Sequence, residues 1–321
     1  KGNKPVYRFR IPKDSTIEFK DLVKGEQSFS TDDLDDFIVR KKDNTPTFMF
    51  ANAIDDSLMG VDLVLRGDDH LSNTPRQIAL LEALGLSLPR YAHVSLFTGS
   101  DGAPLSKRNG SISINDLREQ GYLPIAVSNY LSRVGHTIVD NDLKTHSELA
   151  DEFKIDNISS SPSKFDMDQL LYWQKKAVEE LNINECSIWL KDSLEGLPSS
   201  VDNENFVALI KDNIIFPHEA QEYLNNLFLT PLTKREEIIN IIRSAGKEFY
   251  LQAYDAIPSE IIDWNETVQN IGSITGKKGK ELFMPLRCAI TGQTKGPELD
   301  RVVNLIGTEQ VQKKLKEASE L

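Results

Sequence analysis

The stretch VDLVLRGDDHLSNTPRQIALLEALG, residues 61–85, carries the clearest structural pattern in the chain. Its first five residues are mostly apolar, as expected of a buried strand. Thr74 is a suitable helix N-cap, Pro75 suits the first helical position, and Gly85 suits a helix C-terminus. A second apolar run at 94–97 predicts another short strand. Strand, helix and strand in this order predict a parallel α/β unit, half of a nucleotide-binding fold.

The residues before this unit predict further strands. Residues 6–11 alternate apolar and polar side chains, and 17–19 follow after a polar turn, so we expect a hairpin here. Residues 36–40 and 47–53 predict a second strand pair, joined by the turn-forming segment KKDNTP. The chain before about Ser111 is therefore expected to be rich in β-structure.

From about Ile114 onward the pattern changes. Apolar residues recur at helical spacing, and strand patterns are nearly absent. We expect one or two all-helical domains, with no more than two or three strands beyond residue 120. Helices are predicted over 123–134, 143–153, 167–181, 206–214, 232–242 and 261–271.

The composition narrows the class of protein. The chain has 321 residues, 39% of them hydrophobic, which is enough for packed cores. Its net charge is -12, so any contact with nucleic acid must come from a local basic patch. The two cysteines, Cys186 and Cys288, form no CxxC pair, so we expect no zinc and no other bound metal, and unpaired thiols fit the cytoplasm. No run approaches the roughly 20 apolar residues of a membrane span.

A loop with glycines and cations follows the apolar run at 94–97. It has the sequence GAPLSKRNG from 102 to 110. Lys107 and Arg108, beside the Ser106 hydroxyl, suit phosphate, because a cation on a mobile loop can follow the charge on a departing pyrophosphate. Exposed basic turns are also common, so the loop alone leaves a phosphate site and a solvated turn both open.

The segment Arg66-Gly67-Asp68-Asp69-His70 lies at the carboxyl end of a predicted strand, where ligands bind in α/β sheets. Arg66 suits a carboxylate there, and the acidic pair suits hydroxyl or ammonium donors. Alternatively, Asp68 or Asp69 is only a favourable charge at a helix start. Just upstream, Asp55-Asp56 is more typical of a turn or cap than of a catalytic pair.

A basic cluster lies near the end of the chain. It is the local patch that an acidic protein would need to contact RNA, although a solvated helix start would have the same composition. Its members are Lys277, Lys278, Lys280, Arg287, Lys295 and Arg301.

Taken in order, these segments resemble the bacterial glutamyl-tRNA synthetases, which are class I aminoacyl-tRNA synthetases. Each motif is weak alone, but the ordered set is specific and covers essentially the whole chain. The matching segments are LDDFIVR at 34–40, NTPTF at 44–48, DDSLMG at 55–60, RGDDHLSNTPRQ at 66–77, LSKR at 105–108, FDMDQL at 165–170, FMPLR at 283–287 and AITG at 289–292.

The resemblance implies an α/β fold, the second half of a Rossmann-type class I catalytic domain with part of its β-rich insertion, followed by an all-helical anticodon-binding region. The implied domains are the remainder of the acceptor-stem-binding insertion at 1–36, the C-terminal half of the catalytic domain at 37–112, a helical stem-contact domain at 113–182 and an all-helical anticodon-binding domain at 183–321.

The resemblance also implies residue roles. Lys107 matches the lysine that stabilises pyrophosphate during activation, and it is the expected catalytic residue. Glutamate binding is implied for Phe48, Asn52 and Arg66, ATP binding for Asp69, His70, Leu105, Ser106, Lys107 and Arg108, and tRNA contact is expected of Lys277, Lys278, Lys280 and Arg287. The implied substrates are L-glutamate, ATP as its Mg²⁺ complex and glutamate tRNA, with glutamine tRNA left open. We expect a monomer.

Three departures from the family pattern bear on activity. The family's HIGH-type motif and first glutamate-binding residues, expected before Lys1, are absent from these residues; Phe48 replaces a tyrosine; and Ala103-Pro104 stands where Lys-Lys is expected. We therefore expect a glutamate–tRNA ligase of which this chain alone is inactive. The alternative is a catalytically inactive tRNA-binding paralogue. A short paralogue that glutamylates a modified tRNA base is disfavoured by the helical segment 183–321.

Overall fold

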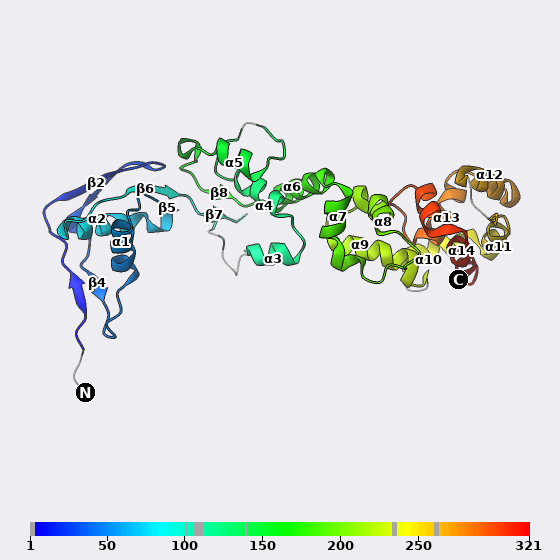
Figure 1. The fold of residues 1–321 in the computed structure, drawn as a ribbon, viewed down its shortest axis with the longest axis horizontal. Helices are drawn as coiled ribbons and strands as arrows, with labels where there is room; N and C mark the ends of the chain where they lie inside the picture. Colours follow the sequence, from blue (N-terminus) through cyan, green and yellow to red (C-terminus); the bar gives the residue numbers. More distant parts are fainter. Residues whose placement is uncertain are drawn as a thin grey trace. The chain divides into compact units, whose positions relative to one another are not determined.

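The computed structural model describes residues 4–99, 102–103, 105, 112–138, 140–232, 236–259 and 263–321. The chain divides into two compact units (Figure 1). The first contains residues 1–113 and 125–173, and the second contains 114–124 and 174–321. Strands lie in the first unit, and the second unit is built from helices.

The first unit contains a four-stranded sheet with the order β3-β2-β6-β5. Strands β2 (Thr16–Asp21) and β3 (Gly25–Ser30) form an antiparallel hairpin. Strands β5 (Leu63–Gly67) and β6 (Arg90–Val94) are parallel, and β2 joins β6 where Asp21 pairs with Tyr91. The sheet thus brings the end of β2 next to strands that lie far along the chain.

The expected hairpin between residues 6–11 and 17–19 is wrong. Strand β1 (Tyr7–Phe9) pairs instead with β4 (Phe37–Arg40) in a separate two-stranded sheet. The Phe9 and Phe37 rings lie 5.6 Å apart, centroid to centroid. The strand pattern itself was recognisable, but the partner was not, because alternation alone does not specify which strands pair.

The expected strand at 47–53 is also wrong, because this segment forms helix α1 (Phe48–Leu58). Its apolar run, Phe48-Met49-Phe50-Ala51, fits a strand or a helix equally well. Packing decides between them: Ala53, on α1, is buried against Leu80 and Leu81. Phe48 and Asn52 therefore lie one helical turn apart on the same face.

The strand–helix–strand unit is confirmed as β5, α2 (Thr74–Ala83) and β6, with β5 and β6 parallel. Thr74 begins the helix and Asn73 is its N-cap, so the expected cap is wrong by one residue. Gly85 follows the helix with φ of 65°, a conformation that suits glycine. The second strand lies earlier than expected, because β6 ends at Val94, where the apolar run began.

Helices predominate beyond residue 112, as expected. Within the described residues, the only strand after residue 120 is β8 (Ser163–Lys164), which pairs with β7 (Phe97–Thr98). The longer helices are α4 (Pro124–Leu131), α6 (Met167–Glu180), α8 (Asn203–Ile210), α9 (Pro217–Leu224), α10 (Glu236–Ala245), α11 (Lys247–Asp255), α12 (Trp264–Thr275), α13 (Lys280–Thr291) and α14 (Leu299–Ser319). Shorter ones are α3 (Ile114–Glu119), α5 (His146–Glu152) and α7 (Ile183–Trp189).

One continuous hydrophobic core organises the second unit. Phe206 and Ile210 on α8, Leu224 on α9, Ile271 on α12 and Leu286 on α13 are fully buried. Cys186 and Cys288 belong to the same core as free thiols, and burial raises their pKa. Both cysteines are therefore packing residues.

Candidate functional site

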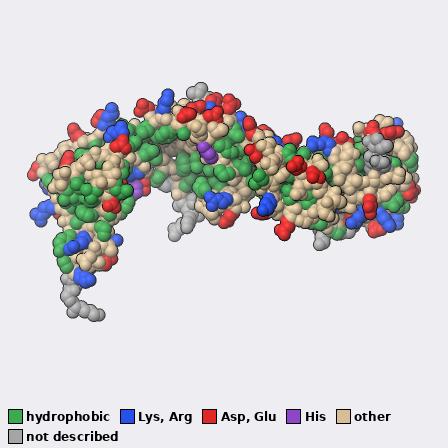
Figure 2. Space-filling view, viewed as in Figure 1, with side chains coloured by type: hydrophobic (Ala, Val, Ile, Leu, Met, Phe, Trp, Pro, Cys, Tyr) green, Lys and Arg blue, Asp and Glu red, His purple; other side chains and the backbone are tan. Residues whose placement is uncertain are grey.

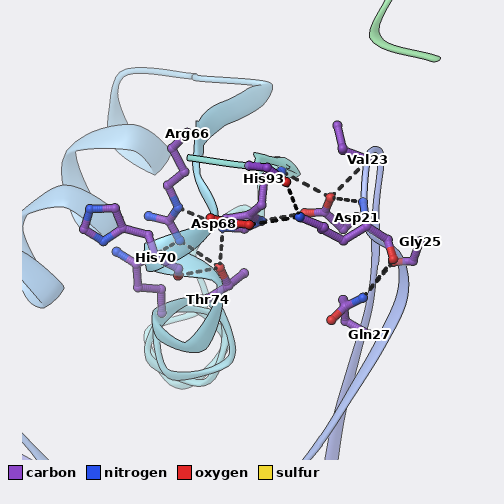
Figure 3. Close-up of polar contacts among 12 residues, drawn as sticks. Asp21, Val23, Gly25, Gln27, Arg66, Asp68, His70, Thr74 and His93 are labelled. Atoms are coloured by element: carbon purple, nitrogen blue, oxygen red, sulfur yellow. Dashed lines mark hydrogen bonds and ion pairs between the residues drawn. The ribbon is translucent and has the colours of Figure 1, made fainter. Parts of the chain in front are cut away.

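Arg66 lies near the carboxyl end of β5, and its guanidinium is held on two sides (Figure 3). Its Nε donates to Nε2 of His93 at 3.1 Å. Its Nη2 donates to the Thr74 hydroxyl and to Oε1 of Gln77, each at 2.8 Å. Its Nη1 has only a long contact of 3.5 Å, to Oδ1 of Asn52, among the described residues. Nη1 is therefore the part of the guanidinium available to a ligand.

His93 and Asp21 stand behind Arg66 in the sheet, and both side chains are fully buried. Nδ1 of His93 lies 2.6 Å from Oδ2 of Asp21. Burial alone would raise the pKa of Asp21, but hydrogen bonds from the Lys24 amide, His93 and the Val23 amide together lower it. Burial lowers the pKa of His93, although Asp21 opposes this shift. Because Nε2 of His93 accepts from Arg66 and both pKa values lie below their ordinary values, the pair is best described near pH 7 as an ionised carboxylate beside a neutral imidazole.

Arg66 lines a pocket of about 350 Å³ beside α1 and β5, and the nearest contact of its Nη1 is Asn52, which lines the same pocket. Four residues expected at the site, Phe48, Asn52, Arg66 and His70, line it together. The rings of Phe48 and His70 lie 5.3 Å apart, and Phe48 is 57% exposed. The remaining lining residues are Asp56, Val61, Leu63, Val64 and Leu65.

Asp56 adds a carboxylate to the pocket, one helical turn after Asn52, and sequence reasoning did not place it there. Burial raises its pKa, while the nearby charge of Arg66 opposes the rise. The Asn52 side chain opposes the rise as well. The pocket therefore offers one cation and one carboxylate, the two charges that complement the carboxylate and ammonium groups of an amino acid.

The two aspartates that follow Arg66 have different surroundings. Asp68 binds Nζ of Lys24 at 2.9 Å, and the same ammonium donates to the Ser95 hydroxyl and the Ser160 carbonyl. Asp69 is half exposed and lies 3.8 Å from the His70 ring. Asp68 thus has a structural role, whereas Asp69 is accessible to a ligand.

The loop expected at the phosphates is only partly within the described residues. Leu105 is described, and its amide donates to the Phe97 carbonyl at 3.0 Å. Ser106, Lys107 and Arg108 lie outside the described residues. Their assignment to ATP stays a prediction.

The basic cluster extends from the end of α12 through α13 to the first turn of α14. Lys278 and Lys280 are exposed, and Lys277 forms an ion pair with Glu281 at 3.8 Å. Arg287 is half-buried and donates to the Pro297 carbonyl at 3.0 Å, so part of its hydrogen-bonding capacity is used within the fold. On the face seen in Figure 2, basic and acidic side chains are interspersed.

The part of the chain that the structure describes has neither a metal cluster nor a membrane span. No group of three or more His, Cys, Asp or Glu side chains there is arranged to hold a metal ion. None of the described helices combines the length and the apolar character needed to cross a bilayer.

Comparison with known proteins places the chain in a family. Residues 1–172 match the family model for class I tRNA synthetases (E and Q), catalytic domain, and residues 206–319 match the model for an anticodon-binding domain. The chain therefore belongs to the class I tRNA synthetases of the E and Q type.

Its relatives within this family are glutamate–tRNA ligases. It is 43% identical over 314 residues to glutamate–tRNA ligase 2 of Nitrosococcus oceani, covering 98% of this chain and 66% of the relative. It is 44% identical to glutamate–tRNA ligase 1 of Halorhodospira halophila, covering 100% and 67%. The crystal structure of a glutamate tRNA ligase from Elizabethkingia meningosepticum, in complex with its amino acid, matches with a TM-score of 0.81 and 25% identity over 98% of this chain and 68% of that one.

These comparisons confirm the expected family and the expected fold, a class I catalytic segment followed by a helical anticodon-binding domain. The chain spans about two thirds of the length of the curated relatives it matches. What the whole protein does is therefore inferred from the site.

Proposed function

We propose that the whole protein is a glutamate–tRNA ligase: it activates L-glutamate with ATP as glutamyl-adenylate and pyrophosphate, then transfers the glutamyl group to tRNA with release of AMP. The observation that carries the proposal is the pocket in which Arg66 presents Nη1 beside Phe48 and Asn52. A guanidinium edge there would bind a substrate carboxylate through a charge-assisted hydrogen bond.

The substrate carboxylate would bind one nitrogen of Arg66, Nη1. Its Nε and Nη2 already donate to His93, Thr74 and Gln77, so a two-nitrogen clamp would require breaking buried hydrogen bonds. The Asp56 carboxylate lines the same pocket and would favour the substrate ammonium. The site thus selects an amino acid over a simple dicarboxylate.

The ATP site adjoins this pocket in the proposal. Asp69, His70 and the segment Leu105–Arg108 would bind ATP, which enters as its Mg²⁺ complex, the metal being part of the substrate. Lys107 would stabilise the negative charge that develops on pyrophosphate. Lys277, Lys278, Lys280 and Arg287 would contact the tRNA. The whole protein would act as a monomer in the cytoplasm.

The test is glutamate-dependent exchange of pyrophosphate into ATP by the whole protein. Lys107→Ala should reduce the exchange rate by about 100-fold or more, with tRNA binding unchanged. Lys20→Ala, at an exposed position on β2, is the matched control and should leave exchange unaltered. Glutamate-independent exchange, or none in the whole protein, would overturn the proposal; tRNA binding without exchange would indicate the inactive paralogue instead.

For the 321-residue chain by itself we expect no exchange. It contains no HIGH-type motif, and charge stabilisation of phosphates requires preorganised groups on both sides of the reacting atoms. Exchange above background, from a sample whose mass matches this chain, would contradict this.

A further inference from the structure

We propose that Asp21 and His93 are positioning residues for Arg66, acting by fixing which nitrogen of the imidazole carries the proton. This inference deepens the proposed function, since it assumes that Arg66 binds the glutamate carboxylate. Neither residue lines the pocket, and both act through the guanidinium.

The orientation of the Asp21 carboxylate is fixed by the backbone. Its Oδ1 accepts three amide N–H groups, from Val23 at 2.9 Å, Lys24 at 2.8 Å and His93 at 3.2 Å. Its Oδ2 is turned to Nδ1 of His93 at 2.6 Å. An ionised carboxylate only accepts, so the proton between them belongs to Nδ1.

The tautomer of His93 then follows. With the proton on Nδ1, the lone pair on Nε2 accepts from Nε of Arg66, and the Thr74 hydroxyl lies 3.1 Å from the same nitrogen. The other tautomer would set an Nε2–H against the Nε–H of Arg66, two donors facing each other in a site that water does not reach. Figure 3 shows these groups in succession from Asp21 through His93 to Arg66.

The consequence for the substrate is geometric. His93 fixes one end of the guanidinium, while Thr74 and Gln77 fix Nη2. Nη1 is thereby left beside Asn52, which lines the pocket. Without the hydrogen bond to His93 the guanidinium could rotate, because one of its three anchoring hydrogen bonds is gone. The cost would fall on glutamate binding and not on ATP or tRNA.

A competing explanation is that the pair only fastens the sheet, since Asp21 lies where β2 meets β6. Two substitutions of His93 separate these explanations. Asparagine can still donate from the δ position to Asp21 but has no atom at the ε position, whereas glutamine places an acceptor near the ε position and loses the δ donor. If His93 positions Arg66, His93→Gln should retain glutamate affinity better than His93→Asn. If the pair only stabilises the sheet, the order should be reversed.

Asp21→Asn provides the sharper test. Its oxygen must stay on the three backbone N–H groups, so its NH₂ faces Nδ1 and moves the histidine proton to Nε2. In the whole protein we expect the KM for glutamate to rise about tenfold or more, with the KM values for ATP and tRNA unchanged. Asp36→Asn is the matched control. Oδ1 of Asp36 also accepts a backbone amide, that of Ile11 at 3.0 Å, but the hydrogen bond does not involve a histidine.

The proton position is read directly by nitrogen NMR of histidine-labelled chain, which needs neither glutamate nor activity. We expect the proton on Nδ1 in the unsubstituted chain and on Nε2 in Asp21→Asn. A proton on Nε2 in the unsubstituted chain would overturn the inference whatever the protein's substrate. A tautomer that shifts in Asp21→Asn while the KM for glutamate stays constant would overturn it too, and leave the proposed function standing. If Asp21→Asn does not fold, the order of the two His93 variants decides.

Discussion

Arg66→Lys should destabilise the first unit even though it keeps the positive charge. Arg66 makes three short hydrogen bonds, to His93, Thr74 and Gln77, at 3.1, 2.8 and 2.8 Å. A lysine ammonium lacks the planar fork and cannot reach all three acceptors. One or two of them would be left buried without a donor, at about 1–3 kcal/mol each, so we expect a loss of roughly 2–4 kcal/mol.

The assay is hydrogen exchange of the backbone amides of α2, which carries Thr74 and Gln77. The expected loss corresponds to exchange that is roughly 30- to 1000-fold faster. Arg90→Lys is the matched control: Arg90 also lies in the parallel strand pair, but its ion pair with Asp62 is exposed, and such pairs contribute about 1 kcal/mol or less. Equal exchange in the two variants would refute the view that Arg66 is anchored by its hydrogen bonds.

Three further predictions concern the pocket, the RNA surface and the buried histidine. Phe48→Tyr should restore a hydroxyl donor at the exposed edge of the pocket and tighten glutamate binding by about 1 kcal/mol, measured by calorimetry on the whole protein; weaker binding would mean that the hydroxyl does not reach the substrate. Substituting alanine for all three lysines within 277–280 should weaken tRNA binding. The slope of log affinity against log salt concentration should fall by about one unit or less for each phosphate that is no longer neutralised. Unchanged affinity and salt slope would exclude this loop from the RNA surface. Burial lowers the pKa of His93 below its ordinary value of 6.5, so only the unfolded chain takes up a proton just below pH 6.5. The unfolding free energy of the first unit should therefore decrease as the pH is lowered below 6.5, by up to about 1.4 kcal/mol per pH unit. Hydrogen exchange across β6 measures this loss of stability, which should be absent in His93→Gln.

Much of the fold was predictable because local pattern and tertiary packing agree in it. The run at 61–65, the proline at the helix start and Gly85 after it all favour the strand and helix that form. The predictions failed where a strand and a helix fit the same residues, as at 47–53, and where alternation did not specify the partner strand, as at 6–11. They also failed where a polar side chain interrupts a strand. Strand β6 was placed too late because His93 breaks its apolar pattern. The structure buries this histidine with Asp21, Arg66 and Thr74 as its polar partners.

The site was predictable in part for a similar reason. Phe48, Asn52, Arg66 and His70 could be named from motifs, and the structure brings them to one pocket. Asp21 and His93 could not, because a buried polar pair is recognised by its geometry, and its members are 72 positions apart. The only signal in the sequence was a charged residue and a histidine within segments that otherwise form strands. Lys107 and its neighbours remain expectations from the family pattern.

That separation has a consequence for synthesis of the chain. Asn52, Arg66 and Gln77 emerge from the ribosome before His93, and Asp21 emerges earlier still. Until residue 93 is available, Asp21 can bind only the neighbouring amides of Val23 and Lys24, and the Nε of Arg66 has no acceptor in the imidazole. Closing a loop of this length costs entropy that local contacts do not offset. On a nascent chain the Arg66 guanidinium should therefore reach its final position only after residue 93 has emerged.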